Sequence, residues 1–500
     1  MSTEVVGYVV GESRPYEFQV LSFRPLMVGE YLYLEYHGYR VLAMVSSSST
    51  GSPFINEELT NPEDVRRLVQ NVRSGERMFY HRGIAKVLGH VADGGRFTIP
   101  PIPPPPGTEV RRAPRSILEK VFSPRGSEWV RIGVLLREPD VEVRVNINKV
   151  VSRHLAILAM TGMGKSNLVA LLSRRIAALG GTVVIFDYHG EYTSLRFRDV
   201  LVNVVAPKIN PYDMDLDEIS RLLNIRRNAS RQRMVLMECL EVARRNRGKE
   251  SFFDSLKRCV QSKIPRSGLP AYRVLEAIVS HEVSLKRILD EEVESVVDRI
   301  ALGAINVVDL SELHSNQADA VVSHWLAKLL DARKKALWSN GSKGLPVPII
   351  AVIEEAHVFI STDEETSTRS SAESIAREGR KFGVGLVIVS QRPRGLDPNI
   401  LSQIGNLAVM RIVHPEDQMY IARHCEPITQ DIVEELPGLN VGEAILLGEW
   451  VRAPTAAKID LVAEKSVGMD LNAVEIWRKF IGVDKQSTAS LARRTSRSLL

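Results

Sequence analysis

Short runs in which apolar and polar residues alternate dominate the first hundred positions, as in EFQVLSFRPLMVGEYLYLEYHGYRVLAMV. A period of two is typical of half-buried strands, and short strands separated by turn glycines indicate a small β-barrel or sandwich. RGIAKVLGHV and RFTIP continue the pattern, and SEWVRIGVLLREPDVEVRVNI predicts further strands that complete the barrel. We therefore predict an all-β barrel domain over residues 1–145 that acts as an interaction module.

A proline-rich segment, IPPIPPPPG at 99–107, interrupts this region. Consecutive prolines exclude helix and inner strand and favour an extended chain. Two interpretations follow: a stiff spacer, which we favour, or a ligand for a proline-reading domain.

From about residue 150, short apolar runs alternate with helical patterns, which indicates a parallel sheet covered on both faces. Between 207 and 303 the chain instead predicts amphipathic, Arg-rich helices. We predict an α/β core over 146–465, a helical insertion at about 210–302, two closing strands in GEAILLGEWVRAPTAAKIDLV, and a basic tail over 466–500. The predicted core strands are 154–159, 182–188, 201–207, 304–310, 349–356, 383–391 and 406–413.

The overall length, charge and cysteine content of the chain add limited information. The chain of 500 residues has 65 Lys and Arg against 60 Asp and Glu, a weak indication of a polyanionic partner. It contains no apolar run of about 18 residues, and its start does not resemble a secretion signal, so we expect no membrane span. Cys239, Cys259 and Cys425 lie far apart in sequence without metal-ligand spacing, which predicts reduced cysteines and a cytoplasmic location.

AMTGMGKSN at 159–167 follows a predicted strand and precedes the helical pattern SNLVALLSRRIAALG. In a phosphate-binding loop, backbone N–H groups and a helix N-terminus surround phosphate oxygens, a lysine reaches the terminal phosphates, and a serine hydroxyl binds Mg²⁺. Ala159 replaces the usual first glycine, which is tolerable where φ is negative. We predict that ATP binds to Thr161, Gly162, Met163, Gly164, Lys165, Ser166 and Asn167, with Mg²⁺ at Ser166.

Two adjacent carboxylates, Glu354 and Glu355, follow the apolar run IIAVI. Hydrolysis needs such an acid at the end of a neighbouring strand. Because adjacent strand residues point to opposite sides, Glu354 is expected on the Mg²⁺ side and Glu355 beside the attacking water. Aspartate is the usual residue on the Mg²⁺ side, so Glu354 departs from the common pattern.

Gln391 ends the next predicted strand, near the γ-phosphate if the strand ends converge. It either orients water and senses the nucleotide, or caps a loop. Arg380 lies at the end of the helix SIAREGRKFG, where it is either a surface residue or a guanidinium that reaches the nucleotide of a neighbouring subunit.

The ordered motifs AMTGMGKSN, FDYHGEY, NVVDLSEL, AVIEEAH, AREGRKFGVGLVIVSQRPRGLDPNILSQIGN and RIVHPED closely resemble the archaeal HerA helicase–translocases, in the HerA–FtsK group of RecA-like hexameric ATPases. The resemblance covers roughly residues 120–460 and extends to the barrel. It implies a homohexamer that moves along double-stranded DNA, works with the NurA nuclease on DNA ends, and uses ATP and Mg²⁺.

On this resemblance Glu355 is the catalytic acid and Arg380 acts in trans. From the motifs themselves, Lys165 and Gln391 are the other two candidate catalytic residues. Asp187 and Glu191 match the acidic positions of FDYHGEY; they either support the metal shell or make a folding hydrogen bond.

DNA passing through a ring would meet local basic residues rather than a strongly basic protein. We expect contacts from Arg392 and Arg394 in QRPRGLDP, or from the Arg-rich helices at 221–249.

Two other functions fit the same motifs: a nucleotide-gated scaffold that loads a nuclease with slow hydrolysis, and an ATPase that moves or assembles protein. A protein-moving ring is expected to carry aromatic and apolar pore loops, whereas RPRGLDP favours DNA.

Overall fold

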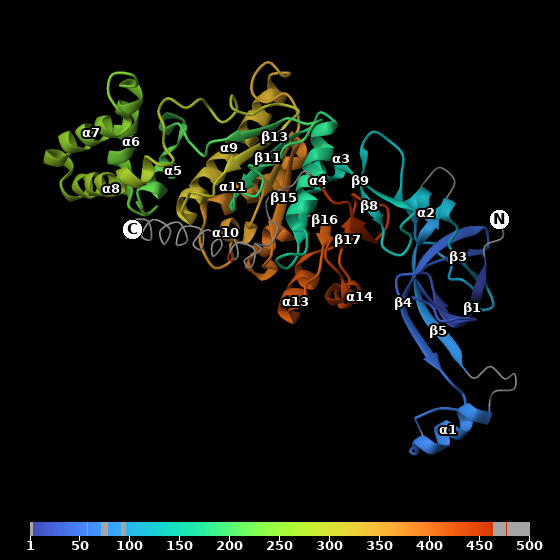
Figure 1. Cartoon of the computed structure of the whole chain (residues 1–500). Helices are drawn as coiled ribbons and strands as arrows, with labels where there is room; N and C mark the ends of the chain where they lie inside the picture. Colours follow the sequence, from blue (N-terminus) through green and yellow to red (C-terminus); the bar gives the residue numbers. More distant parts are fainter. Residues whose placement is uncertain (1–3, 58, 72–78, 92–96, 464–476, 478–500) are drawn as a thin grey trace, which may run out of the picture.

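The computed structural model describes residues 4–57, 59–71, 79–91, 97–463 and 477. Figure 1 shows an N-terminal barrel, a central α/β core and a helical lobe at the far side of the core. The predicted tail, 466–500, falls outside the described residues except for Trp477. No helix in the described part of the chain is long and apolar enough to cross a bilayer.

The N-terminal domain is a closed barrel, as predicted. Its strands run in the order β2-β1-β7-β3-β4-β5-β6, and pairing of β2 with β5 closes the sheet. Helix α1 (Pro62–Asn71) lies at the end of the long β4–β5 hairpin (Figure 1). The strands are β1 (Val5–Arg14), β2 (Glu17–Ser22), β3 (Tyr31–Tyr36), β4 (Tyr39–Gly51), β5 (Tyr80–Val91), β6 (Phe97–Thr98) and β7 (Glu109–Arg112).

One prediction about this region is wrong. The proline-rich segment itself joins β6 to β7, so both of its ends belong to the barrel. Tyr36 Oη donates to the Ile102 carbonyl at 2.8 Å, which holds the segment against the barrel wall. The strands after it, β8 (Trp129–Leu135) and β9 (Glu142–Asn146), do not complete the barrel but extend the core sheet through β18 (Thr455–Ile459). The last barrel strand therefore ends at Arg112 rather than near residue 145.

An eleven-stranded sheet forms the core, in the order β12-β13-β11-β14-β15-β10-β16-β17-β18-β8-β9. The run from β12 to β16 is parallel, and the remaining pairs are antiparallel. All seven predicted core strands and both closing strands are present. They are β10 (Leu155–Leu158), β11 (Thr182–Asp187), β12 (Val202–Val205), β13 (Ile305–Asp309), β14 (Ile349–Ile353), β15 (Val384–Ser390), β16 (Asn406–Val409), β17 (Glu443–Gly448) and β18 (Thr455–Ile459).

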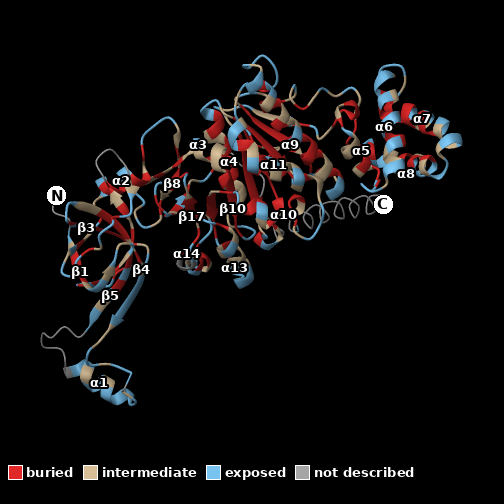
Figure 2. Cartoon of the chain, turned by 180° about the vertical axis from the view of Figure 1, so that it is seen from behind, coloured by how far each residue is buried: buried red, intermediate tan, exposed pale blue. Residues whose placement is uncertain are grey.

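Helices cover both faces of this sheet, and alternate strand residues contribute to two separate cores. Ile157, Val183 and Val352 join the core under α4 (Lys165–Ala178), whereas Leu158, Val184 and Ile353 join the core under α9 (Ser315–Trp338) and α11 (Ser367–Phe382). Figure 2 shows the resulting buried centre. The other helices of the core are α2 (Arg115–Phe122), α3 (Ile147–Arg153), α10 (Ala356–Phe359), α12 (Pro398–Leu401), α13 (Pro415–His424) and α14 (Gln430–Glu435).

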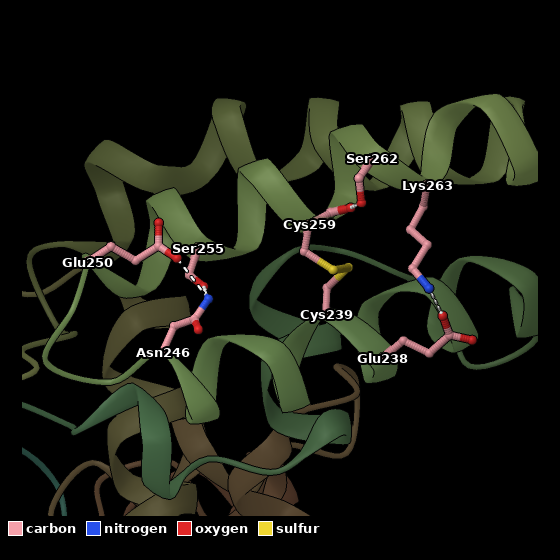
Figure 3. The surroundings of a disulfide bond; sticks show 8 residues. All are labelled: Glu238, Cys239, Asn246, Glu250, Ser255, Cys259, Ser262 and Lys263. Carbon is pink, nitrogen blue, oxygen red and sulfur yellow. Dashed lines mark hydrogen bonds and ion pairs between the residues drawn. A yellow bond between two sulfur atoms is a disulfide. The ribbon is translucent and has the colours of Figure 1, made fainter.

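The predicted insertion is a lobe of helices that projects from the core (Figure 1). It consists of α5 (Leu216–Leu222), α6 (Ser230–Arg245), α7 (Phe252–Ser267) and α8 (Leu269–Leu285). Cys239 of α6 and Cys259 of α7 form a disulfide, with their Cα atoms 5.5 Å apart (Figure 3). The expectation of reduced cysteines is therefore wrong for this pair, because packing of α6 against α7 brings together residues 20 positions apart. Cys425 is free and buried.

Candidate nucleotide-binding and hydrolysis site

Apart from Arg380, the acidic, nucleotide-binding and catalytic residues singled out in the sequence follow four neighbouring parallel strands, β11, β14, β15 and β10. Loop 159–164 follows β10, Asp187 ends β11, Glu354 and Glu355 follow β14, and Ser390 and Gln391 mark the exit of β15. Carboxyl ends of parallel strands share one edge of a sheet, so these groups meet at that edge. We call this group the candidate active site.

Loop 159–164 turns through two glycines in the left-handed region, Gly162 at φ 78° and Gly164 at φ 106°. A side chain at either position would strain the turn. Ala159 lies outside that region, so its Cβ is accommodated and the missing first glycine carries no backbone cost. Gly164 is also the N-cap of α4, which aims the N-terminal N–H groups of α4 at the loop.

Lys165 Nζ bonds within its own loop, donating to the carbonyls of Ala159 and Met160 at 3.1 and 3.2 Å. Burial lowers the pKa of Lys165, while the charges of Glu355 and Glu354 oppose the shift. The ammonium group is therefore held over the loop and faces the two carboxylates.

Other predicted loop residues have different surroundings. Thr161 donates its hydroxyl to Gln391 Oε1, and the Met163 carbonyl accepts from the Gly442 N–H at 3.0 Å. Ser166 lies in the first turn of α4, where a metal-binding hydroxyl is expected. The Asn167 side chain instead bonds to the backbone of Asp460 and Val462 beyond β18, at 2.9 Å each, so it anchors α4 to the strand exit.

Glu354 is almost fully buried, and its Oε1 accepts a 2.6 Å hydrogen bond from the Tyr192 hydroxyl. Its Oε2 is buried without a hydrogen-bond partner. Burial raises the pKa of Glu354 to about 8; the Tyr192 bond opposes the shift, and Asp187 and Glu191 reinforce it. An unpartnered buried carboxylate oxygen is costly unless a cation or proton satisfies it.

Glu355 has a left-handed backbone, φ 46° and ψ 45°, as the N-cap of α10. This conformation is strained for a residue with a side chain, and such strain is found at functional sites. Two histidines flank the carboxylate: His189 Nε2 lies 3.7 Å from Oε1, and His357 Nδ1 lies 3.2 Å from Oε2. Burial raises the pKa of Glu355, and Lys165 and His189 oppose the shift.

The two arginines after β15 differ. Arg392 is exposed, and its charge affects the pKa of Glu355, so it lies near the candidate active site. Arg394 is ion-paired with Glu416 and lies 3.5 Å from Asp417, both on α13. Arg392 is therefore better placed than Arg394 to meet an external phosphate.

Arg380 is exposed near the end of α11, which leads into the start of β15. Its charge lowers the pKa of Glu449, which is ion-paired with Lys149 and Arg153. Arg380 therefore lies toward the amino end of the strands, away from the candidate active site of its own chain.

Asp187 makes a folding hydrogen bond, one of its two predicted alternatives. Its carboxylate accepts from the N–H groups of Glu191 and Tyr192 at 3.0 and 2.8 Å, which fixes the loop after β11. Glu191 affects the pKa of both Glu354 and Glu355, which places its carboxylate near theirs.

Sequence reasoning missed three residues of the site: His189, Tyr192 and His357. All lie inside the quoted motifs FDYHGEY and AVIEEAH, so their position next to the acids was the available signal. The contacts of His189 and Tyr192 with the acids, and of His357 with Ser390, join different strand exits and therefore do not follow from spacing.

Mg²⁺ fits this set of donors as an ion bound together with a nucleotide. Among the described residues, no group of three or more His, Cys, Asp or Glu side chains could hold a metal ion. Mg²⁺ in phosphate-binding sites is held by one or two protein oxygens, substrate phosphates and water. Ser166 Oγ and the unpartnered Glu354 Oε2 could supply the protein oxygens.

Comparison with known proteins identifies the family. The family model "Helicase HerA, central domain" matches residues 130–329, and that of the HAS barrel domain matches 6–93. The chain is 40% identical over 490 residues to the DNA double-strand break repair helicase HerA of Saccharolobus solfataricus, covering 95% of this chain and 96% of that protein. The corresponding protein of Sulfurisphaera tokodaii is 39% identical, with 95% and 97% covered.

Among solved structures, VirB4 of Thermoanaerobacter pseudethanolicus shares the core fold, with a TM-score of 0.53 at 16% identity over 68% of this chain and 98% of that one. This likeness confirms the predicted P-loop ATPase fold and carries no information on substrate. The sequence relatives extend over nearly the whole chain, barrel and helical insertion included. The chain belongs to the HerA helicase family.

Proposed function

We propose that this protein is an ATP-driven translocase or helicase that acts on double-stranded DNA during end processing, as a homohexamer and with a partner nuclease of the NurA type. The observation that carries the proposal is the meeting of Lys165, the Glu354–Glu355 pair and Gln391 at one sheet edge. Two relatives that align with 95% of this chain are named as DNA double-strand break repair helicases.

The loop 161–167 would hold the phosphates of ATP through backbone N–H groups and the N-terminus of α4. Lys165 Nζ would exchange its two loop carbonyls for the terminal phosphate oxygens, which are stronger acceptors. Bound Mg²⁺ would neutralise charge on the β- and γ-phosphates. Ser166 and Glu354 would hold it, and Tyr192 would fix the Glu354 carboxylate.

Glu355 would accept the proton of the attacking water. A base must be ionised to do this, and the neighbouring Lys165 and His189 favour its charged form. Gln391 contacts Thr161 of the loop 161–167, so its position would depend on whether a nucleotide is bound there. These roles would place recognition, metal binding and proton transfer on adjacent strands.

Arg380 would complete the active site of a neighbouring subunit. Its place toward the opposite end of the sheet would keep it away from a nucleotide bound to its own chain, and an exposed guanidinium suits a phosphoryl group across an interface. In a ring, each nucleotide would then require two subunits.

DNA would contact Arg392, because Arg394 is neutralised by Glu416 and Asp417. Arg392 also donates its backbone N–H to Ser390 Oγ at 3.0 Å. A shift of this loop would therefore move or break a hydrogen bond at the exit of β15. The alternative functions, a nuclease scaffold with slow hydrolysis or a protein-moving ATPase, share the nucleotide chemistry but not a dependence on DNA.

Steady-state ATP hydrolysis with and without linear duplex DNA at low salt tests the proposal. We expect stimulation by duplex DNA that declines with salt, since phosphate contacts release counterions. Glu355→Gln should still bind ATP but lose turnover by at least about 100-fold. Hydrolysis that is indifferent to DNA would support a scaffold or a protein-moving motor instead.

A further inference from the structure

His357 lies between the catalytic carboxylate and the loop after β15. It belongs to the short helix α10, directly after the acid pair, and its side chain is largely buried. Its Nδ1 is 3.2 Å from Glu355 Oε2 and 3.3 Å from Ser390 Oγ. One ring nitrogen thus faces two oxygens at the exits of the neighbouring strands β14 and β15.

Only one of these two contacts is a hydrogen bond in the structure. Nδ1 bonds with Ser390 Oγ, while Glu355 Oε2 is buried without a hydrogen-bond partner despite its short distance from the ring. A neutral imidazole nitrogen either donates one proton or accepts one. When Nδ1 carries the ring proton, it can donate that proton to Glu355 Oε2 or to Ser390 Oγ, but not to both at once.

The loop after β15 is tied to the same histidine. Ser390 Oγ accepts the Arg392 N–H at 3.0 Å. A Cβ atom on Gly395 would lie 3.0 Å from His357 Cβ, so the loop backbone packs directly against the stem of the histidine. Movement of the segment 390–395 would change the position of the ring, and the ring would change what Glu355 can bond to.

We propose that His357 is a positioning residue that orients the Glu355 carboxylate and couples it to the Arg392 loop by exchanging Ser390 for Glu355 at Nδ1. The proposal rests on the proposed ATPase function. In one arrangement, the one in the structure, Nδ1 bonds Ser390 Oγ and Glu355 Oε2 has no hydrogen-bond donor. In the other, Nδ1–H donates to Glu355 and fixes it toward the water. Loop movement selects between them.

His189 does not share this property. Its ring approaches the other oxygen of Glu355 at 3.7 Å and is about half exposed, and its loop follows β11 rather than β15. Among the described residues, no hydrogen bond or ion pair joins His189 to the segment 390–395.

The test compares His357→Leu, which keeps bulk but no nitrogen, with His357→Asn, whose amide nitrogen can occupy the place of Nδ1. Turnover, the affinity for a fluorescent ATP analogue and stimulation by linear duplex DNA are measured for the full-length protein. His281→Leu, a change on α8 of the insertion, serves as the matched control.

We expect His357→Leu to lower kcat about 10- to 100-fold, as misplacement of a reacting group does. Affinity for the analogue should change less than about threefold, and the stimulation ratio should approach one. His357→Asn should recover most of the loss in kcat. In a Glu355→Gln background, His357→Leu should produce no further loss, because the two residues act as a unit.

If His357→Leu hydrolyses ATP as fast as the wild type and is stimulated by DNA to the same extent, the inference is overturned while the proposed function stays intact. Loss of both kcat and analogue affinity, without rescue by asparagine, would show a purely structural role and also overturn it. A wild-type protein that does not hydrolyse ATP would refute the proposed function itself. The wild-type measurement shows this before any variant is compared.

Discussion

The buried carboxyl group of Glu354 predicts how stability depends on pH. Its pKa is raised to about 8 in the folded protein, whereas an exposed glutamate titrates near 4.5. Between these values the folded state binds one proton more than the unfolded state. The contribution of Glu354 to stability is therefore fully present below about pH 4.5 and is lost as pH rises toward 8.

The slope follows from proton linkage. One extra proton in the folded state lowers the free energy of unfolding by about 1.4 kcal/mol per pH unit. From pH 5.5 to 7.5, we therefore expect Glu354 to cost roughly 2–3 kcal/mol. Asp187, Glu355 and Tyr192 lie around the group and have raised pKa values of their own, so the wild-type curve alone also contains their contributions.

Glu354→Gln separates these contributions. The amide is neutral at every pH and keeps an oxygen for the Tyr192 hydroxyl, so the variant removes the titration without removing that bond. Unfolding by denaturant is followed without Mg²⁺ or nucleotide, with a probe in the core sheet. The stability of the wild type relative to the variant should fall across this range. Parallel pH curves for the two proteins would show that Glu354 does not titrate there and would refute the reasoning.

Two further predictions concern the insertion and the subunit interface. The Cys239–Cys259 bond closes a loop of about 20 residues, so reduction should destabilise the insertion by roughly 3 kcal/mol, seen as faster amide exchange in α6 and α7. The Cys239→Ala/Cys259→Ala variant should not respond to reductant; equal exchange in oxidised and reduced wild type would contradict the prediction. Mixing Arg380→Ala with Glu355→Gln subunits should restore measurable ATP hydrolysis, because an intact Glu355 then meets an Arg380 from its neighbour. Mixtures as inactive as each variant alone would exclude action in trans.

Local patterns predicted much of the core from the sequence. All the core strands, the phosphate-binding loop, the acid pair and the helical insertion are features of consecutive residues, and the structure contains each. The harmless replacement at Ala159 was also predictable, because its cost depends only on local backbone angles.

Contacts between distant segments were not predictable in the same way. Period-two alternation identifies β8 and β9 as strands but does not say that they pair beside β18 rather than in the barrel. The disulfide depends on how α6 packs on α7. The bond from Tyr192 to Glu354 and the contacts of His357 depend on the order of strands in the sheet.

ATP-dependent displacement of a third strand from a linear duplex tests the central claim most directly, since a protein moving along duplex DNA must remove a triplex-forming oligonucleotide in its path. We predict that the wild-type protein displaces the oligonucleotide with Mg²⁺ and ATP and does not do so with a nonhydrolysable analogue. Glu355→Gln should bind the same duplex without displacement. Displacement by Glu355→Gln at the wild-type rate, or its absence in a wild-type protein that hydrolyses ATP on this DNA, would contradict the account.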